Sequence, residues 1–300
     1  MNKGILFVLG TAVISGFAIF TSKILVASID PIVYTTLKNL FVAGVLTAIL
    51  IANKSLRNQW KQLSRRDWWN LIAIGAIGGG IPFALFFTGL KLTSATDATL
   101  IHKTLFIWVA LFAIPVLHER LRLIQMAGYV LVLWGVLWTS GYRFAGDTGE
   151  LYIALATILW ALENILAKKA VSHIPGIIVA WGRMTVGVGI LAILLVIMGK
   201  APLMADLHTN MLMPFLAASI LLTGYVVTYY SSLKYIPVTV ASAVLILATP
   251  ITALLEYGIL NKAISFSQWQ SYGLLAIGLL CITGFFLHVH RHRQPVSTGQ

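Results

Sequence analysis

Long apolar runs constrain this chain more than any other feature of its sequence. The hydrocarbon core of a bilayer is ~30 Å thick, and about 20 helical residues cross it. Charged residues, prolines and glycine clusters divide the sequence into ten runs of that length. The predicted spans cover roughly residues 4–27, 33–52, 70–90, 96–117, 123–140, 149–168, 176–198, 211–231, 238–260 and 268–288. We therefore predict an all-α membrane protein with ten transmembrane helices.

The composition excludes a water-soluble globule. Hydrophobic residues make up 59% of the 300 residues and charged residues only 10%, whereas ~25% of a typical soluble domain is charged. The mean hydropathy of +0.90 requires much of the apolar surface to face lipid. The net charge of +12 does not indicate nucleic acid as a partner, because no basic, aromatic-rich domain accompanies it. The single cysteine, Cys281, excludes a disulfide framework and a cysteine-based metal site, and no cofactor is expected.

The distribution of Lys and Arg over the loops predicts the orientation. With ten spans both termini lie on one side, which carries thirteen Lys or Arg residues against four on the other. Since cytoplasmic loops are enriched in positive charge, both termini are predicted to be cytoplasmic. The N-terminal apolar stretch lacks a small-residue cleavage site before Lys23 and is interpreted as the first helix, not as a secretory signal. The expected location is the cell (inner or plasma) membrane, with residues 289–300 forming a cytoplasmic tail.

The longest connection between predicted spans, residues 53–69, is basic and amphipathic. It contains Trp60, Trp68 and Trp69, and tryptophan is enriched where the membrane meets water. We predict a surface helix at the level of the lipid headgroups.

The two halves of the chain show weak but ordered similarity. At an offset of 145 residues, Lys38 meets Arg183 and Gly44 meets Gly189, and the offset later drifts to 143. Because five helices per half is an odd number, equivalent helices must run in opposite directions, and the charges of the equivalent loops differ accordingly. Such inverted repeats place a substrate site near the membrane midplane, which indicates transport. The predicted five-helix repeats are residues 1–141 and 149–288.

Two sequence patterns resemble those of a known family. A basic residue opens the second helix of each half, Lys38 and Arg183, and the segment HERLRLIQMAGYVLVLWGVL leads into the fifth helix. That segment contains an acidic residue, a glutamine and two glycines, namely Glu119, Gln125, Gly128 and Gly135. With ten short helices in two halves, the pattern resembles the EamA branch of the drug/metabolite transporter superfamily. In the second half Pro250 fits the pattern, but Asn261 or Lys262 replaces the acidic residue.

The resemblance implies a ten-helix exporter or facilitator of small metabolites, often amino acids. It also implies a central cavity lined by helices 1, 3, 4, 6, 8 and 9, with helices 5 and 10 at the periphery. The expected partners are a small-molecule substrate and the lipid bilayer, with protons as candidate coupling ions. The protein is expected to be a monomer or a homodimer.

Ionisable residues at mid-membrane depth are the first candidates for a binding site, because charge is costly to bury in lipid. Six basic residues near predicted helix ends are set aside, because their side chains can reach the headgroups. They are Lys23, Lys38, Lys91, Lys168, Lys234 and Arg183. This leaves Lys103, Glu163 and Glu256, with His102 beside Lys103.

Glu163 is the leading candidate for binding a substrate or a proton. Trp160 and Asn164 lie near it on the sixth predicted span, and the equivalent face of the first span carries Ser15 among other small or polar residues. Such stripes favour a shared cavity over contact with lipid. The alternative for Glu163 is a structural bond to a lysine or a backbone group. Glu256, late in the ninth span, is a second coupling candidate, and a structural ion pair is its alternative.

Lys103 is predicted to face the cavity, and its alternative is an interhelical ion pair with Glu163 or Glu256. His102 diverges from Lys103 by ~100° around the helix, so the two side chains do not share one face. For His102 a simple hydrogen bond to another helix competes with a role in substrate binding.

Aromatic residues and helix-breaking residues give weaker evidence about the binding site. Phe83 lies in the segment IGGGIPFALFF, and Tyr225 and Tyr229 follow Gly224 in the eighth span. Glycine and proline permit the close packing and bending that a moving bundle needs. These three aromatic residues are predicted to line the cavity, with ordinary packing as the alternative.

The leading functional hypothesis is a secondary transporter of amino acids or related small metabolites, in which Lys103 and Glu163 hold the two charges of a zwitterion. The first alternative is proton-coupled efflux of hydrophobic or cationic drugs. An integral-membrane lipid-modifying enzyme is a weaker alternative, because it needs clustered acids or histidines and only scattered ones are found. Phosphate-binding loops, zinc-protease motifs and nucleophile elbows are not found either, so an enzyme is not expected.

Overall fold

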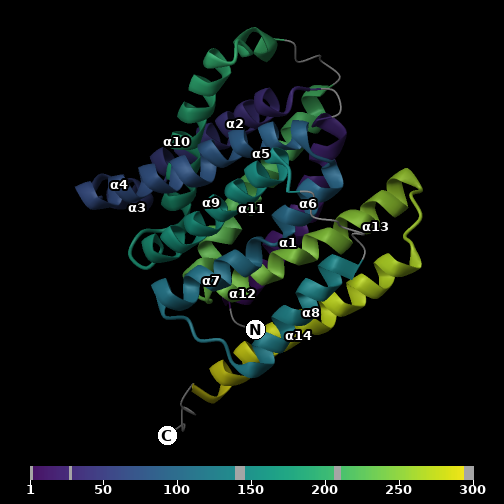
Figure 1. Ribbon diagram of the computed structural model, residues 1–300. Coiled ribbons are helices and arrows are strands. Elements are labelled where there is room, and N and C mark those ends of the chain that lie inside the picture. The colour runs from purple at the N-terminus through teal and green to yellow at the C-terminus, as the bar shows by residue number, and fades with distance from the viewer. Residues whose placement is uncertain (1–2, 27–28, 139–145, 206–210, 294–300) are drawn as a thin grey trace, which may run out of the picture.

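The protein is a bundle of helices (Figure 1). The structure, a computed structural model, describes residues 3–26, 29–138, 146–205 and 211–293, and within these ranges every regular element is a helix. The α-helices are α1 (Lys3–Val26), α2 (Pro31–Ala52), α3 (Lys54–Lys61), α4 (Arg65–Ile74), α5 (Ile81–Leu92), α6 (Ala95–Lys103), α7 (Leu105–Leu117), α8 (Leu123–Trp138), α9 (Thr148–Ala170), α10 (Gly176–Ile197), α11 (Leu212–Leu233), α12 (Val238–Val244), α13 (Ala248–Leu260) and α14 (Phe266–Arg293). A π-helix covers Gly75–Gly80, and 3₁₀ turns cover Ala201–Ala205 and Leu245–Leu247. The predicted all-helical fold is confirmed.

Eight helical segments of the described chain are long and apolar enough to cross a bilayer. They are Lys3–Ser22, Pro31–Ala52, Arg65–Leu92, Asp97–Leu117, Thr148–Ala170, Gly176–Ile197, Leu212–Leu233 and Val238–Leu260. Helix α8 is apolar but shorter. The number ten therefore stays a prediction, while a chain that crosses a membrane several times is well supported.

Equivalent elements recur in the two halves. Helices α2 and α10 both have 22 residues, and α7 and α13 both have 13. Helix α7 ends at a left-handed His118 (φ 54°) and α13 ends at a left-handed Asn261 (φ 53°), 143 positions later (118 to 261). A left-handed residue commonly terminates a helix in this way. These matches agree with the offset found in the sequence, and the inversion of the halves stays a prediction.

The main helix contacts join the first half of the chain to the second. Helix α1 packs on α11, α2 on α10, α5 on α9, and α8 on α14. Figure 1 shows α8 and α14 side by side along one edge of the bundle. Their contact depends on Gly128 and Gly278, since a Cβ on Gly128 would lie 2.6 Å from the carbonyl oxygen of Gly278. The motif glycine thus has a packing role, as small residues often have between membrane helices.

The connection 53–69 is not one surface helix. Helix α3 is exposed, as predicted, but a second helix, α4, begins at Arg65 and continues into the apolar segment. Ser64 and Asp67 form a reciprocal capping box at this start. Trp60 and Trp68 pack edge to face against Trp181, with ring centroids 5.5 and 5.9 Å from it.

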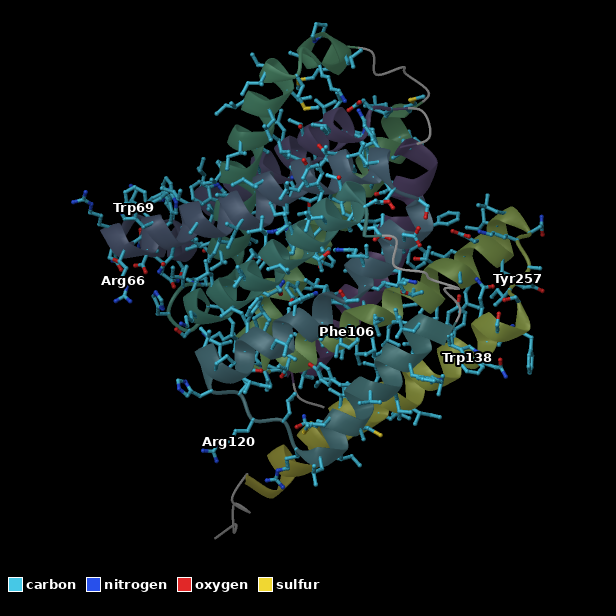
Figure 2. The ribbon with its side chains drawn as sticks, viewed as in Figure 1. Arg66, Trp69, Phe106, Arg120, Trp138 and Tyr257 are labelled. Atoms are coloured by element: carbon cyan, nitrogen blue, oxygen red, sulfur yellow. The ribbon has the colours of Figure 1, made fainter. Side chains whose placement is uncertain are left out.

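Labelled residues mark the two ends of the bundle. In Figure 2, Arg66 and Arg120 lie at one end, and Trp138 and Tyr257 lie at the opposite end. Phe106, which is 2% exposed, lies between them in the core. The end with Arg66 and Arg120 is the one predicted to be cytoplasmic.

Glu119 holds the start of α12. Its carboxylate accepts hydrogen bonds from the amide of Val238 (2.8 Å), the amide of Thr239 (3.2 Å) and the Thr239 hydroxyl (2.6 Å). The first amides of a helix have no partner within the helix, so a carboxylate from another element stabilises them. The acidic residue of the motif therefore joins the first half to the second.

Replacing Glu119 by Ala is expected to lower the free energy of unfolding by about 1–2 kcal/mol, because the N-terminal amides of α12 lose their acceptor. The measurement is the unfolding midpoint in detergent. Arg120→Ala, at the exposed neighbouring position, is the matched control. Equal midpoints for the two variants would contradict the capping role.

Candidate functional site

Three of the apolar segments are interrupted near their middle. The segment Arg65–Leu92 contains the π-helix Gly75–Gly80, the segment Asp97–Leu117 breaks at Thr104, and the segment Val238–Leu260 contains the 3₁₀ turn Leu245–Leu247. Irregular backbone at membrane depth is tolerated where it is buried in protein or lines a cavity. In transporters such interruptions accompany the substrate site. These interruptions therefore indicate a substrate site among the helices that contain them.

The π-helix exposes the carbonyl of Gly78. Four residues later comes Pro82, which has no amide hydrogen, so the usual helical donor to the Gly78 oxygen is missing. Two side chains from the second half take its place. The indole Nε1 of Trp160 and the guanidinium Nη2 of Arg183 each donate to this oxygen at 3.0 Å.

Glu163 lies beside this carbonyl in the protein interior. Its side chain is 3% exposed, and its Oε1 accepts a hydrogen bond of 2.5 Å from the Tyr230 hydroxyl. The Nε of Arg183 lies 4.0 Å from the same oxygen, so the two charges pair without a direct hydrogen bond. A Cβ at position 78 would lie 2.3 Å from Cγ of Glu163, so any larger residue there would displace the Glu163 side chain.

Two buried polar atoms in this region have no hydrogen-bond partner in the described part of the chain. They are Arg183 Nε and His102 Nδ1. Both residues lie next to Trp160. Arg183 and Trp160 donate to the same Gly78 oxygen, and the ring centroids of His102 and Trp160 are 4.9 Å apart. An unpaired polar atom in the interior is costly, and a bound polar ligand would relieve that cost.

Aromatic rings surround Trp160. Phe83 lies 5.3 Å and Phe86 5.7 Å from it between ring centroids, and His102 meets both Trp160 and Phe86. Phe83 and His102, both candidate site residues, thus lie beside Trp160. His102 packs edge to face here, and a hydrogen bond from its Nδ1 to another helix is not found among the described residues.

Asn164 and the tyrosines of α11 complete the cluster. The Tyr229 hydroxyl donates to Asn164 Oδ1, and Asn164 Nδ2 donates to the Trp160 carbonyl at 2.8 Å. Tyr225 stacks on Tyr229 with ring centroids 5.8 Å apart. The structure therefore brings together seven of the predicted site residues: Glu163, Trp160, Asn164, His102, Phe83, Tyr225 and Tyr229.

Lys103 is placed differently from its predicted role. It is the last residue of α6, at the break before Thr104, and it has no ion pair in the described ranges. The alternative of an ion pair with Glu163 or Glu256 is not found, because Glu163 faces Arg183 and Glu256 pairs with Lys262 at 3.1 Å.

Ser15 and Glu256 lie on helices α1 and α13. Ser15 is half-buried on α1, which packs on α11 and α13, and no hydrogen bond of its hydroxyl joins it to Glu163. Glu256 lies near the end of α13, with the exposed Lys262 as its ion-pair partner.

Two of the basic residues set aside as snorkelling are wrong assignments. Arg183 has a side chain only 12% exposed and belongs to the central cluster. Lys168 donates from Nζ to the carbonyls of Leu233 (2.5 Å) and Ile236 (2.8 Å), so it caps the end of α11. Lys38 lies 4.5 Å above the centroid of the Tyr34 ring, a cation–π contact.

Comparison with known proteins decides the family. Residues 2–141 and 147–284 match the EamA-like transporter family. The chain belongs to this family. The predicted resemblance is confirmed, and the protein is an EamA-like membrane transporter.

Relatives from three organisms are named as uncharacterized transporters. A Methanothermobacter thermautotrophicus protein is 25% identical over 234 residues, which is 75% of this chain and 66% of the relative. A Clostridium kluyveri protein is 23% identical over 88% of both chains. A Synechocystis protein is 28% identical over 81% of this chain and 72% of its own.

A solved crystal structure has the same fold. It superposes with a TM-score of 0.77 and 19% identity, over 94% of this chain and 96% of its own. At this identity the likeness concerns the fold alone.

Proposed function

We propose that this EamA-like protein is a secondary transporter of amino acids or related small zwitterionic metabolites. The observation that carries the proposal is the unpaired Nε of Arg183 beside the buried carboxylate of Glu163. A substrate carboxylate would accept from Arg183, and a substrate ammonium would donate to Glu163 and the Gly78 oxygen. The rings around Trp160 would cover an apolar side chain.

Transport would follow by alternating access. We propose ten transmembrane helices in two inverted repeats, residues 1–141 and 149–288, with the cluster between them. The family match in both halves and the recurrence of α2 in α10 and of α7 in α13 support this organisation. Inverted repeats move around a central site that opens to each side in turn.

The test is uptake by proteoliposomes of a panel of radiolabelled amino acids, with and without a pH gradient. At least one zwitterionic amino acid is expected to accumulate above empty liposomes and to compete with unlabelled substrate. Uptake restricted to compounds that lack one of the two charges would contradict the proposed pairing.

One observation favours a second candidate, proton-coupled efflux of hydrophobic cations. Among the described residues, Glu163 carries the only carboxylate of the central cluster. The aromatic rings of Tyr230 and Trp160 lie close to it. Aromatic faces bind cations, and a proton could replace the cation on Glu163. A hydrophobic cation therefore belongs in the panel, and its transport against a proton gradient in the absence of amino-acid uptake would select this candidate.

We also propose that both termini are cytoplasmic and that the protein lies in the inner or plasma membrane. The bias of thirteen basic residues against four supports this orientation. A reporter that is active only outside the cytoplasm, fused after Gln300, is expected to give no signal. The same reporter placed after Lys200 is the positive control, and a strong signal from the C-terminal fusion would contradict the orientation.

A further inference from the structure

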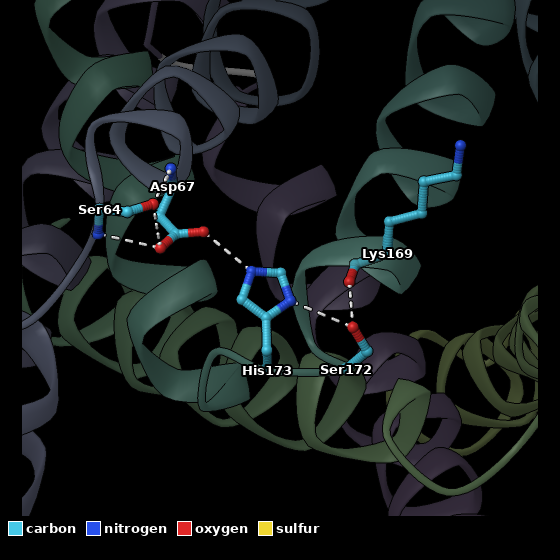
Figure 3. A network of polar contacts seen from close by, with 5 residues as sticks. All are labelled: Ser64, Asp67, Lys169, Ser172 and His173. Carbon is cyan, nitrogen blue, oxygen red and sulfur yellow. Dashed lines mark hydrogen bonds and ion pairs between the residues drawn. The ribbon is translucent and has the colours of Figure 1, made fainter.

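A polar network joins the two halves at the end of the bundle that carries Arg66 (Figure 3). His173 lies in the turn between α9 and α10, and its Nε2 is 2.8 Å from Oδ1 of Asp67 in the first turn of α4. Its Nδ1 is 3.1 Å from the Ser172 hydroxyl. The network therefore connects a helix of the first half to a turn of the second.

The donors and acceptors of this network suit a charged imidazole. Ser172 Oγ donates its hydrogen to the Lys169 carbonyl at 2.7 Å, so toward His173 it can only accept. The other oxygen of Asp67 accepts from the amide and hydroxyl of Ser64, so Asp67 is a carboxylate that accepts from His173. The imidazolium form, in which both ring nitrogens carry a hydrogen, therefore satisfies both acceptors.

Solvent protons can reach this histidine. Its side chain is 53% exposed, whereas that of Asp67 is 15% exposed. Histidine is the side chain that ordinarily changes charge between about pH 5 and 8. On deprotonation the charge–charge attraction between His173 and Asp67 is lost.

Other charged groups surround the network. On α4, Arg65 and Arg66 precede Asp67 and are exposed. On the other elements, Glu119, Lys168, Lys169 and Lys234 line, together with Ser172, a cavity of about 600 Å³. These groups bring three positive charges and one negative charge to the cavity beside Ser172.

A second ion pair joins the halves at the opposite end. Asp30 caps the start of α2, and it binds Lys200, which follows α10. Burial alone would raise the pKa of Asp30, but the hydrogen bonds from Lys200 and from the amides of Ile32 and Val33 hold this pKa below its usual value. This pair therefore stays charged over the range in which histidine titrates.

We propose that Asp67 and His173 form a proton-dependent latch, which closes the end of the transporter that carries Arg66 and releases it when His173 loses its proton. The proposal rests on the proposed function, because the latch controls access to the site at Glu163. The Asp30–Lys200 pair closes the opposite end without responding to pH in this range. Both pairs are formed in this structure.

The test measures distances between two spin labels by pulsed electron paramagnetic resonance, in nanodiscs and without substrate. The labels are attached at Arg66→Cys on α4 and Lys234→Cys after α11, in a Cys281→Ser background. A label at position 234 is expected to move with the α9–α10 turn that carries His173, because Lys168 on α9 donates hydrogen bonds to carbonyls at the end of α11. The ratio of long to short distances is expected to rise about two- to fivefold from pH 5.5 to 8.5, since a partly exposed ion pair is weak.

Three variants make the measurement specific. His173→Gln keeps a donor for Asp67 but does not titrate, so the pH response should vanish, and Asp67→Asn should abolish it as well. Asp30→Asn is the matched control at the other end and should retain the response. Two results would overturn the latch. One is a distance ratio that does not change with pH in the parent protein, and the other is a pH response that persists in both His173→Gln and Asp67→Asn.

The distance measurement separates the latch from the proposed function, because it requires no substrate. Amino-acid uptake without a pH-dependent distance change would refute the latch alone. A pH-dependent distance change without uptake of any panel compound would refute the proposed function alone.

Discussion

Replacing Arg183 by Met is expected to lower the free energy of unfolding by about 3–5 kcal/mol and to abolish uptake, because it leaves the Glu163 carboxylate buried without its counter-charge. Glu163→Gln should also abolish uptake and should destabilise the protein less, since the amide oxygen can still accept from Tyr230. The double variant should recover much of the stability lost in Arg183→Met, because no unpaired charge remains. It should not recover uptake.

The measurement is a double-mutant cycle of unfolding midpoints in detergent, with uptake by proteoliposomes measured for the same four proteins. Lys103→Met is the matched control, since Lys103 is a basic residue of a membrane segment without an ion pair in the described chain. Lys103→Met should be as stable as the parent protein. If this variant loses uptake, the prediction that Lys103 binds the substrate is supported. An Arg183→Met protein as stable as the parent would show that the two charges are not coupled.

Seven residues of the central cluster were among the candidates that the sequence offered, but the sequence did not predict that α10 contributes to the cluster. Glu163 was recognisable because a carboxylate deep in an apolar run is costly unless it is used. Trp160 and Asn164 followed from helical periodicity, which places residues three or four apart on one face. These inferences are local, so they needed no knowledge of which helix packs against which.

Arg183 was missed because depth was judged from the helix end. It lies seven residues after Gly176, the first residue of α10, which is about 10 Å along the axis, and an arginine can extend most of that way to the headgroups. The structure turns it inward to the oxygen of Gly78. That partner lies 105 positions earlier in the chain, and only the packing of α10 on the π-helix brings them together.

The helix interruptions were predictable to different degrees. Gly78 and Pro82 stand four residues apart, which is enough to predict a free carbonyl at Gly78 from the missing amide of proline. By the same rule Pro250, four residues after Ile246, leaves the Ile246 carbonyl without its usual helical donor, inside the 3₁₀ turn Leu245–Leu247. The break at Thr104 has neither a glycine nor a proline at Thr104 or four residues later, so no such local pattern predicts it.

Gly187 decides how closely α10 approaches the π-helix, and Gly187→Ala is expected to be among the most damaging single substitutions. A Cβ at this position would lie 2.6 Å from the carbonyl oxygen of Gly79 and 2.7 Å from its Cα. Because these atoms belong to the backbone, no side chain can move aside to make room. The π-helix must shift away from α10, and the Gly78 oxygen moves away from Arg183 with it.

Gly187→Ala should therefore cost about 1–3 kcal/mol of stability, as overpacking in a core does, and should strongly reduce uptake in the protein that still folds. Gly189→Ala is the matched control on the same helix, since a Cβ there meets no atom within 4 Å. Gly189→Ala should leave the stability unchanged or raise it slightly, because alanine has a higher helix propensity than glycine. The comparison of unfolding midpoints and uptake rates tests the close approach directly. Equal behaviour of the two alanine variants would mean that the contact between α10 and the π-helix does not position Arg183.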